Sequence, residues 1–393
     1  MKLKSKRKVA ENRREFKLRV EWTAMKIGVF CPTLNVYGGG EFVAIAIANT
    51  LAQNNRNVVL FTNNEVNPQA IKNFFGENLH PTIRTIKQPT HFTSRGLADF
   101  YQTIFHSYIA KSKCNVFIDT FSNCVFPWTS ISYIHFPFLN QYSFSKKFPY
   151  MGSPHLLQVG TLPHVLFEKN LVSYDKKLVL ANSYYTADEI RKYSQKTVEV
   201  LYPPFSSSIS AIGKDTIKNS QENLVITTSR FEPNKLLERI PHIASQTDSN
   251  IQFAIIGRLY SKETLTNLQG TVKKLDLTDR IKFYPNATAE KKIELLKKAK
   301  IYLHTMIGEH FGISIVEAMA LGCLPIVHNS GGMSEFVPEQ YRYETLQEAA
   351  SKITSEINNW STEKANEIKK ISDRFSISNF SLRFMELFSK YCN

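Results

Sequence analysis

The sequence predicts an α/β protein made of two doubly wound, Rossmann-like domains that face each other across a cleft. Three observations predict this class. Short runs of β-branched and aromatic residues alternate with amphipathic stretches. The alternation stops at a Pro/Ser-rich, weakly patterned segment, residues 203–222, and then starts again. With 393 residues, the chain is long enough for two domains that each have a core.

The elements follow in order along the chain. Strands of the first half are expected at 26–31, 57–62, 116–119, 131–135, 178–182 and 198–202, and helices at 40–54, 94–111 and 186–194. Strands of the second half are expected at 224–229, 251–256, 280–284, 301–304 and 324–328. The domains are then a basic extension (1–24), a first domain (25–202), a linker (203–222), a second domain (223–375) and a C-terminal helix (376–393).

Composition limits the class further. Hydrophobic residues make up 42% and charged residues 21% of the chain, which is typical of a globular protein. We expect no transmembrane helix, because no run of about 18 apolar residues occurs, and no secretory signal, because the N-terminus lacks an apolar segment. The five cysteines are scattered without metal-ligand spacing, which favours a reducing, cytoplasmic setting. They are Cys31, Cys114, Cys124, Cys323 and Cys392.

The net charge of +15 is uneven, because residues 1–24 hold nine Lys or Arg against three Glu. The remaining positive charge is spread thinly. It suits a polyanionic small ligand or an anionic membrane surface better than a nucleic-acid groove. A solubilising tail, or an upstream start codon ahead of Met25, explains the extension equally well.

A glycine-rich loop precedes the first helix, in "YGGGEF" (37–42). Gly38, Gly39 and Gly40 allow backbone N–H groups to approach an anion at a helix N-terminus. An alternative at this point is a dehydrogenase in which Glu65 binds the ribose of the cofactor. However, the dinucleotide fingerprint needs its glycines directly after the first strand, and "PTLNVY" intervenes. The long loop favours a lid over a phosphate or a sugar.

Two groups of charged residues follow strands of the second half. In "TTSRFEPNK" (227–235), Arg230 and Lys235 suit a diphosphate clamp, although two solvent-exposed cations are an equal alternative. In "GEHFGISIVEAMALG" (308–322), Glu309 and Glu317 are eight positions apart. In a continuous helix they would be about 12 Å apart. That distance is too long for a glycosidase acid/base pair, which needs about 5–10 Å, but it suits two ends of an elongated ligand. Two solvated helix glutamates remain the alternative.

Together these residues resemble the retaining GT-B glycosyltransferases of glycosyltransferase family 4, over nearly the whole chain from Met25. Within that family, the chain looks most like the mannosyltransferases that extend dolichol-linked oligosaccharides on the cytoplasmic face. Further similar stretches are "FIDTF" (117–121), "YIHFP" (133–137), "ANSYYT" (181–186), "LYPP" (201–204), "SRFEPNK" (229–235) and "HNSGG" (328–332). The resemblance implies a GT-B fold whose C-terminal helix crosses back to the first domain.

The resemblance also implies site roles. Arg230 and Lys235 would hold the donor diphosphate, and Glu317 would bind the ribose. Glu309 would contact the donor sugar, beside the backbone N–H groups of His310, Phe311 and Gly312. His135, in "YIHFP", would hydrogen-bond the transferring sugar. The sequence has no D-x-D motif, so we expect no metal and no cofactor, with the clamp and helix N-termini neutralising the leaving diphosphate. Retention would then come from front-face attack by the acceptor hydroxyl.

The implied function is transfer of a hexose, with mannose from GDP-mannose preferred, onto a lipid-linked or other glycan. A UDP-sugar-dependent transferase, a nicotinamide-dependent dehydrogenase and a non-catalytic basic binding module are the alternatives. Expected partners are a nucleotide sugar, a glycan or lipid-diphosphate-linked glycan and an anionic membrane surface, but no nucleic acid. The aromatic and basic segment 140–160 either contacts headgroups or packs on its own domain. The expected location is the cytoplasm, at the cytoplasmic face of a membrane.

Overall fold

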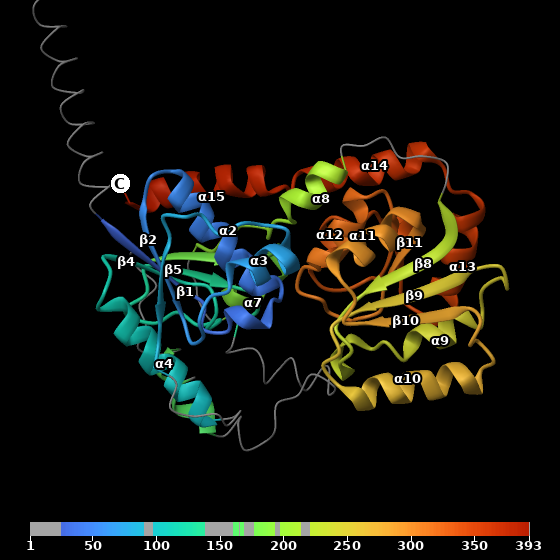
Figure 1. Cartoon of the computed structure of the whole chain (residues 1–393), viewed down its shortest axis with the longest axis horizontal. Helices are drawn as coiled ribbons and strands as arrows, with labels where there is room; N and C mark the ends of the chain where they lie inside the picture. The colour runs from blue at the N-terminus through green and yellow to red at the C-terminus, as the bar shows by residue number, and fades with distance from the viewer. Residues whose placement is uncertain are drawn as a thin grey trace, which may run out of the picture.

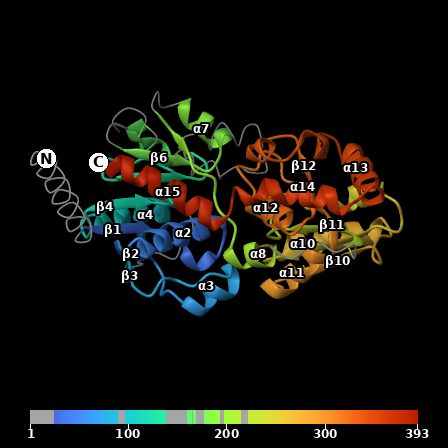
Figure 2. The same ribbon diagram turned by 90° about the horizontal axis from the view of Figure 1, so that it is seen from above.

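The computed structural model describes residues 25–89, 97–137, 160–164, 166–168, 177–192, 197–213 and 221–392. The basic extension and most of the segment 140–160 lie outside the described residues. Within them, the chain forms two α/β domains side by side, as Figure 1 and Figure 2 show. One domain contains a seven-stranded sheet and the other a six-stranded sheet. The predicted fold class is confirmed.

The first sheet is parallel throughout, in the order β3-β2-β1-β4-β5-β6-β7. Its strands are β1 (Lys26–Phe30), β2 (Asn57–Thr62), β3 (Arg84–Lys87), β4 (Val116–Asp119), β5 (Ile131–Ile134), β6 (Leu178–Ala181) and β7 (Glu199–Val200). Six of these strands were predicted. The edge strand β3 was not predicted, because it has charged residues at both ends, is mostly exposed and lacks the apolar pattern of a buried strand.

Helices cover both faces of this sheet. Alternate residues of the central strands pack against α2 (Gly39–Gln53) and α15 (Ile377–Cys392) on one face. On the other face they pack against α4 (Leu97–Lys111) and α7 (Tyr184–Arg191). This pattern explains why the buried strands read as nearly continuous apolar runs, since each strand is covered on both sides.

The second sheet is also parallel, in the order β10-β9-β8-β11-β12-β13. Its strands are β8 (Glu222–Thr228), β9 (Gln252–Gly257), β10 (Ile281–Pro285), β11 (Ala299–His304), β12 (Leu324–His328) and β13 (Arg342–Tyr343). Five were predicted, and the two-residue β13 was not. Further α-helices are α3 (Pro68–Phe75), α8 (Ser207–Ile212), α9 (Arg239–Ala244), α10 (Lys262–Lys274), α11 (Ala289–Lys298), α12 (Ile313–Ala320), α13 (Leu346–Asn358) and α14 (Thr362–Asp373).

Two segments join the domains. Helix α8 lies inside the predicted linker, where Ser206 caps it by accepting a hydrogen bond from the Ile209 N–H. Helix α15 leaves the second domain and runs along α2 of the first (Figures 1 and 2). Its Phe384 is fully buried in the first domain's core, and the hydroxyls of Ser381 and Thr50 lie 2.8 Å apart. The predicted return of the C-terminal helix is confirmed. No helix in the described ranges combines the length and hydropathy needed to span a bilayer.

Glu335 of the second domain also contacts the first domain directly. Its carboxylate accepts hydrogen bonds from the backbone N–H groups of Tyr184 at 3.0 Å and Tyr185 at 2.6 Å, in the first turn of α7. It also accepts one from the Tyr202 hydroxyl at 2.9 Å. The first N–H groups of a helix have no partner within the helix, so a carboxylate placed there satisfies them and interacts favourably with the helix dipole.

Glu335→Gln should therefore loosen this contact between the domains. The amide retains one acceptor oxygen but loses the charge, so we expect the free energy of unfolding to fall by about 1–2 kcal/mol. Denaturant unfolding measures the change. Glu339→Gln, at an exposed position four residues on, is the matched control. Equal stability of the two variants would show that the Glu335 contact contributes nothing to stability.

Candidate active site

The N-terminus of α2 meets the N-terminus of α12 between the two domains. Gly38 is the N-cap of α2, and its N–H donates to the Glu41 carboxylate at 2.9 Å. A Cβ on Gly39 would lie 2.9 Å from the Cδ1 atom of Ile313, the first residue of α12. Glycine at this position thus lets the two helix starts approach closely. Both ends present partial positive charge to the same region, which is how helices bind phosphates.

His135 follows β5 and lies beneath the glycine loop. A Cβ on Gly40 would be 3.1 Å from His135 Nε2. That nitrogen is 3.1 Å from the carbonyl oxygen of Thr120. Because a carbonyl only accepts, Nε2 carries the hydrogen, and Nδ1 is the acceptor of the neutral ring. Burial lowers the pKa of His135, which favours this neutral form. Asn123 fixes the backbone by accepting from the His135 N–H at 2.8 Å.

The loop before α12 is shaped by glycines. Gly312 is the N-cap of α12 with φ of 95°, a conformation that disfavours side chains. The helix therefore begins at Ile313, so Glu309 lies in the loop while Glu317 lies on the helix. The spacing of about 12 Å that a continuous helix would impose does not apply here.

Residues 330–332 of the "HNSGG" stretch support this loop. The Gly332 N–H donates to the Glu309 carbonyl at 2.8 Å, and the Gly308 N–H donates to the Ser330 hydroxyl at 2.9 Å. A Cβ on Gly331 or Gly332 would collide with the backbone of this loop. The glycines are thus needed for close approach, and they fix the backbone of Glu309.

The structure brings Glu309 and Lys235 together. Lys235 Nζ lies 2.9 Å from Glu309 Oε2 and 3.1 Å from the sulfur of Met306. The Nε2 atom of His304 lies 3.3 Å from the same carboxylate oxygen. The side chains of Lys235 and Glu309 are 16% and 15% exposed, so the pair is largely shielded from water. Burial raises the pKa of Glu309, but Lys235 and His304 outweigh burial and hold that pKa well below its usual range.

Glu317 forms a second, similar pair on α12. Its carboxylate lies 3.0 Å from Lys292 Nζ of α11, and the two side chains are 15% and 21% exposed. The Tyr302 hydroxyl donates to Thr228 O or Ser314 Oγ, at 3.1 and 2.8 Å. Burial, and then the charges of Glu317 and Glu309, raise the pKa of Tyr302.

Arg230 is placed differently from Lys235. Its guanidinium pairs with Glu232 at 2.8 Å and lies 5.5 Å from the centre of the Tyr260 ring. Its side chain is 40% exposed, so it is available to an incoming anion at little desolvation cost. Arg230 and Lys235 were predicted as a clamp of two cations. In the structure, each of them has a carboxylate partner, Glu232 for Arg230 and Glu309 for Lys235.

His310 and Phe311 have separate surroundings. The His310 ring stacks on Phe136 of the first domain, with centroids 4.1 Å apart and planes 9° apart. Phe311 is buried, and its ring packs against those of Tyr202 and Phe375. Its side chain is therefore part of the core, so a ligand contact from Phe311 is left to its backbone N–H, as the resemblance implied.

The burial of His310 predicts a pH effect on stability. Burial lowers the pKa of His310 from 6.5 to about 4. A group that binds its proton more weakly when folded stabilises the fold above its unfolded pKa. That stability is lost as pH falls from 6.5 towards 4. We expect a loss on the order of 1–3 kcal/mol. Denaturant unfolding across this pH range, with His310→Gln as comparison, should show a shallower loss in the variant. Parallel curves would contradict this assignment.

Several residues of this site were not predicted. His304 and Lys292 contact the two glutamates, and Ser330 with Gly331 and Gly332 supports the loop. The "HNSGG" stretch resembles the family, but the sequence alone did not indicate its role in supporting the loop. His304 ends a predicted strand, which was a weaker signal. Lys292 lies among several lysines of α11, and its pairing depends on how α11 packs beside α12. Glu65, the alternative ribose ligand, pairs with Lys87 at 3.6 Å and is 88% exposed.

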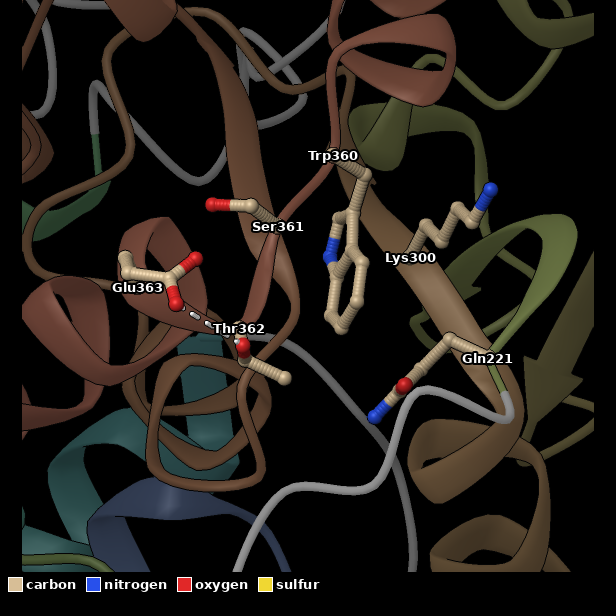
Figure 3. Close-up of a pocket in the computed structure, with 6 residues that line it drawn as sticks. All are labelled: Gln221, Lys300, Trp360, Ser361, Thr362 and Glu363. Atoms are coloured by element: carbon tan, nitrogen blue, oxygen red, sulfur yellow. Dashed lines mark hydrogen bonds between the residues drawn. The ribbon is translucent and has the colours of Figure 1, made fainter.

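Other features lie outside this site. An open pocket of about 440 Å³ lies where α14 begins, and Figure 3 shows the residues that line it. They are Gln221, Lys300, Trp360, Ser361, Thr362 and Glu363, so none of the predicted site residues lines it. Side chains able to hold a metal ion come together in the first domain, at Cys124, His164 and Glu168. Local spacing does not reveal this group, because Cys124 and His164 are 40 positions apart in the sequence.

Comparison with known proteins finds glycosyltransferases, as the sequence resemblance implied. The profile of the family described as "Glycosyl transferases group 1" matches residues 209–373. The curated relatives include proteins named "GDP-Man:Man(3)GlcNAc(2)-PP-Dol alpha-1,2-mannosyltransferase". The one from Dictyostelium discoideum is 26% identical, over 67% of this chain and 60% of the relative. The one from Candida albicans is 30% identical, over 39% and 29%. The human one is 25% identical, over 91% and 84%. The chain thus spans less than two thirds of the first two relatives.

Solved structures show the same fold. The structure of Anabaena Alr3699/HepE in complex with UDP and glucose has a TM-score of 0.69 at 18% identity, covering 93% of this chain and 100% of that one. A glycosyltransferase from Rickettsia africae has a TM-score of 0.67 at 14% identity, covering 94% and 99%. At these identities, the likeness establishes the GT-B arrangement of the two domains.

Proposed function

We propose that this chain transfers mannose from GDP-mannose onto a lipid-linked glycan, with retention of configuration, and the match of residues 209–373 to the glycosyl transferases group 1 family supports the transferase class. The observation that carries this proposal is the group of charged residues at the start of α12. There, the Lys235–Glu309 pair lies in the loop before α12 and the Lys292–Glu317 pair joins α11 to α12, while Ile313, the first residue of α12, lies against Gly39 at the N-terminus of α2. The names of the relatives support the donor and the acceptor class.

In this proposal, the donor diphosphate takes the place of Glu309 beside Lys235. The ammonium then neutralises charge on the leaving group, assisted by Arg230 and by the N-termini of α2 and α12. The released Glu309 carboxylate accepts hydrogen bonds from the sugar, and Glu317 accepts them from the ribose. His135 offers Nδ1 as an acceptor for a sugar hydroxyl on the first-domain side.

The transfer step follows from the proposed positions of Lys235 and Arg230 beside the diphosphate. Lys235 and Arg230 stabilise the diphosphate as it leaves, so the mechanism needs neither a metal ion nor a cofactor on that group. The acceptor hydroxyl attacks from the face that the diphosphate leaves, and its proton passes to a leaving-group oxygen. The sugar–phosphate bond breaks while the new glycosidic bond forms, and the configuration is retained.

Membrane association is proposed from the exposed apolar side chains of the first domain. Helix α4 lies on the side of that domain away from the second domain (Figures 1 and 2). It presents a line of exposed aromatic side chains at helical spacing. The neighbouring helical residues 160–164 and 166–168 add exposed leucine and phenylalanine side chains. They are Tyr101, Phe105, Tyr108, Leu162, Leu166 and Phe167, with exposures of 37–61%. The Tyr101 hydroxyl donates to Gly160 O at 2.8 Å, which joins the two helices. Such a surface suits the headgroup region of a bilayer.

Vesicle binding at low and high salt distinguishes electrostatic attraction by basic residues from insertion of apolar side chains. Attraction by basic residues weakens as salt rises, whereas apolar insertion does not. We expect anionic vesicles to bind the full chain at low salt. We expect Phe105→Ser with Leu166→Ser to weaken the binding that remains at high salt. Failure of wild-type protein to bind anionic vesicles at low salt would favour a water-soluble acceptor.

Nucleotide titration tests the donor. We expect GDP to bind more tightly than UDP or ADP when purified protein is titrated by calorimetry. A complex with UDP is known for a structural neighbour, so a UDP-sugar donor is the specific alternative. Tighter binding of UDP would overturn the mannose assignment. Reduction of a nicotinamide cofactor in place of sugar-nucleotide turnover would overturn the transferase itself.

A further inference from the structure

A buried cluster in the first domain combines three kinds of metal ligand. Cys124 lies in the connection between β4 and β5, and His164 and Glu168 lie one turn apart on the helix at 160–168. The three residues are 1%, 6% and 2% exposed. Their sulfur, nitrogen and oxygen atoms all lie within 4.8 Å of one another. The cluster is separate from the proposed donor site and does not depend on the proposed function.

The distances match the edges of a tetrahedral coordination shell. Zinc binds thiolate sulfur at about 2.3 Å, and imidazole nitrogen and carboxylate oxygen at about 2.0–2.2 Å. Two ligands of one tetrahedral ion therefore lie roughly 3.3–3.8 Å apart. His164 Nε2 is 3.4 Å from Cys124 Sγ and 3.6 Å from Glu168 Oε2. One ring nitrogen thus faces both of the other ligands at the expected spacing.

The surroundings hold two of these ligands in place. The other Glu168 oxygen, Oε1, accepts from the Val125 N–H at 2.7 Å, which fixes the carboxylate beside Cys124. The His164 ring lies between the rings of Phe100 and Phe126, with centroid distances of 5.2 and 5.5 Å. Hydrogen bonding of a ligand's second atom and an apolar shell are typical of built metal sites.

The helix itself is arranged in an unusual way. Among its described residues, the buried positions are polar, namely Thr161, His164 and Glu168, whereas Leu162 and Leu166 are about half exposed. A surface helix normally buries its apolar side. Burying a carboxylate and an imidazole costs free energy unless they are paired or bind a metal. A divalent cation offsets that cost, because its charge balances one thiolate and one carboxylate.

We propose that Cys124, His164 and Glu168 bind a structural zinc ion, with water completing the tetrahedral shell. Thiolate and imidazole ligands in tetrahedral geometry favour zinc over magnesium or calcium. On binding, the Cys124 thiol gives its proton to solvent and the sulfur bonds to the metal. The ion joins the helix at 160–168 to the β4–β5 connection. That connection also holds Asn123, whose side chain fixes the His135 backbone.

Metal analysis of the full chain, prepared without a polyhistidine tag, tests this proposal. We expect about one zinc ion per chain, and a chelator should lower the melting temperature reversibly. Cys124→Ser, His164→Gln and Glu168→Gln should each weaken zinc binding by at least about 100-fold. Cys323→Ser is the control, because Cys323 is buried in the second domain outside this cluster.

Two outcomes would overturn the proposal. One is wild-type protein that contains no zinc after growth with added zinc and whose melting temperature does not respond to zinc. The other is zinc content that is unchanged in Cys124→Ser. If the variants fail to fold, cobalt substitution of the wild-type chain shows whether the cluster binds a metal ion. Thiolate-to-cobalt absorption bands support the site, and their absence shows that the trio is only a hydrogen-bonded cluster.

Discussion

Lys235→Ala should reduce kcat/KM by about 100- to 1000-fold, because in the proposed mechanism its ammonium neutralises the leaving diphosphate. Affinity for the bare nucleoside diphosphate should also fall, by about 10- to 100-fold. The substitution also leaves Glu309 without its partner at 2.9 Å. Steady-state turnover of GDP-mannose and calorimetric titration with GDP measure the two effects.

Two further variants show whether the effect is specific to Lys235. Arg230→Ala should cost less than Lys235→Ala, because Arg230 is more exposed and water screens its charge. Lys282→Ala, at an exposed position of β10, should change neither quantity. Melting temperatures show whether Lys235→Ala remains folded. A folded Lys235→Ala protein with wild-type turnover would remove Lys235 from the site.

Glu309→Gln and Glu317→Gln should fail in different ways. Glu317→Gln weakens charge-assisted hydrogen bonds to the ribose, so affinity for GDP should fall by about 10- to 100-fold. Glu309→Gln should leave GDP affinity nearly unchanged or increased, because Lys235 is no longer paired with a carboxylate. Its kcat should fall by about 100-fold, since its partner is the sugar in the transition state.

Both glutamates are similarly buried and each has one lysine partner, while Glu309 also lies 3.3 Å from His304. Loss of a buried, lysine-paired charge is therefore common to both variants, and a difference in GDP affinity against turnover goes beyond it. Calorimetry with GDP beside turnover of GDP-mannose distinguishes the cases. Equal, small effects would mean that both carboxylates are structural ion-pair partners only.

Much of the fold was predictable because its signals are local. Parallel strands such as Ile131–Ile134 are buried on both faces and mostly apolar, and glycine with a following apolar run marks the start of α2. The edge strand β3 and the two-residue β13 carry no such pattern, so the sequence did not reveal them. The boundaries predicted for the domains remain predictions.

The site was predictable as a set of positions but not as a set of contacts. Gly312 and the helix start at Ile313 follow from local sequence. The pairing of Lys235 with Glu309 joins residues 74 positions apart, and that of Lys292 with Glu317 joins residues 25 apart. Such pairs depend on how strands and helices pack. Cys124 and His164, 40 positions apart, were missed for the same reason.

The most direct test of the proposed activity is transfer of labelled mannose from GDP-mannose to a lipid-linked oligosaccharide by the full chain in vesicles. The account predicts a labelled lipid product that forms with the wild-type chain and is nearly absent with Lys235→Ala, with the new linkage in the α-configuration of the donor. Transfer from UDP-glucose but not from GDP-mannose, or a product of inverted configuration, would contradict it.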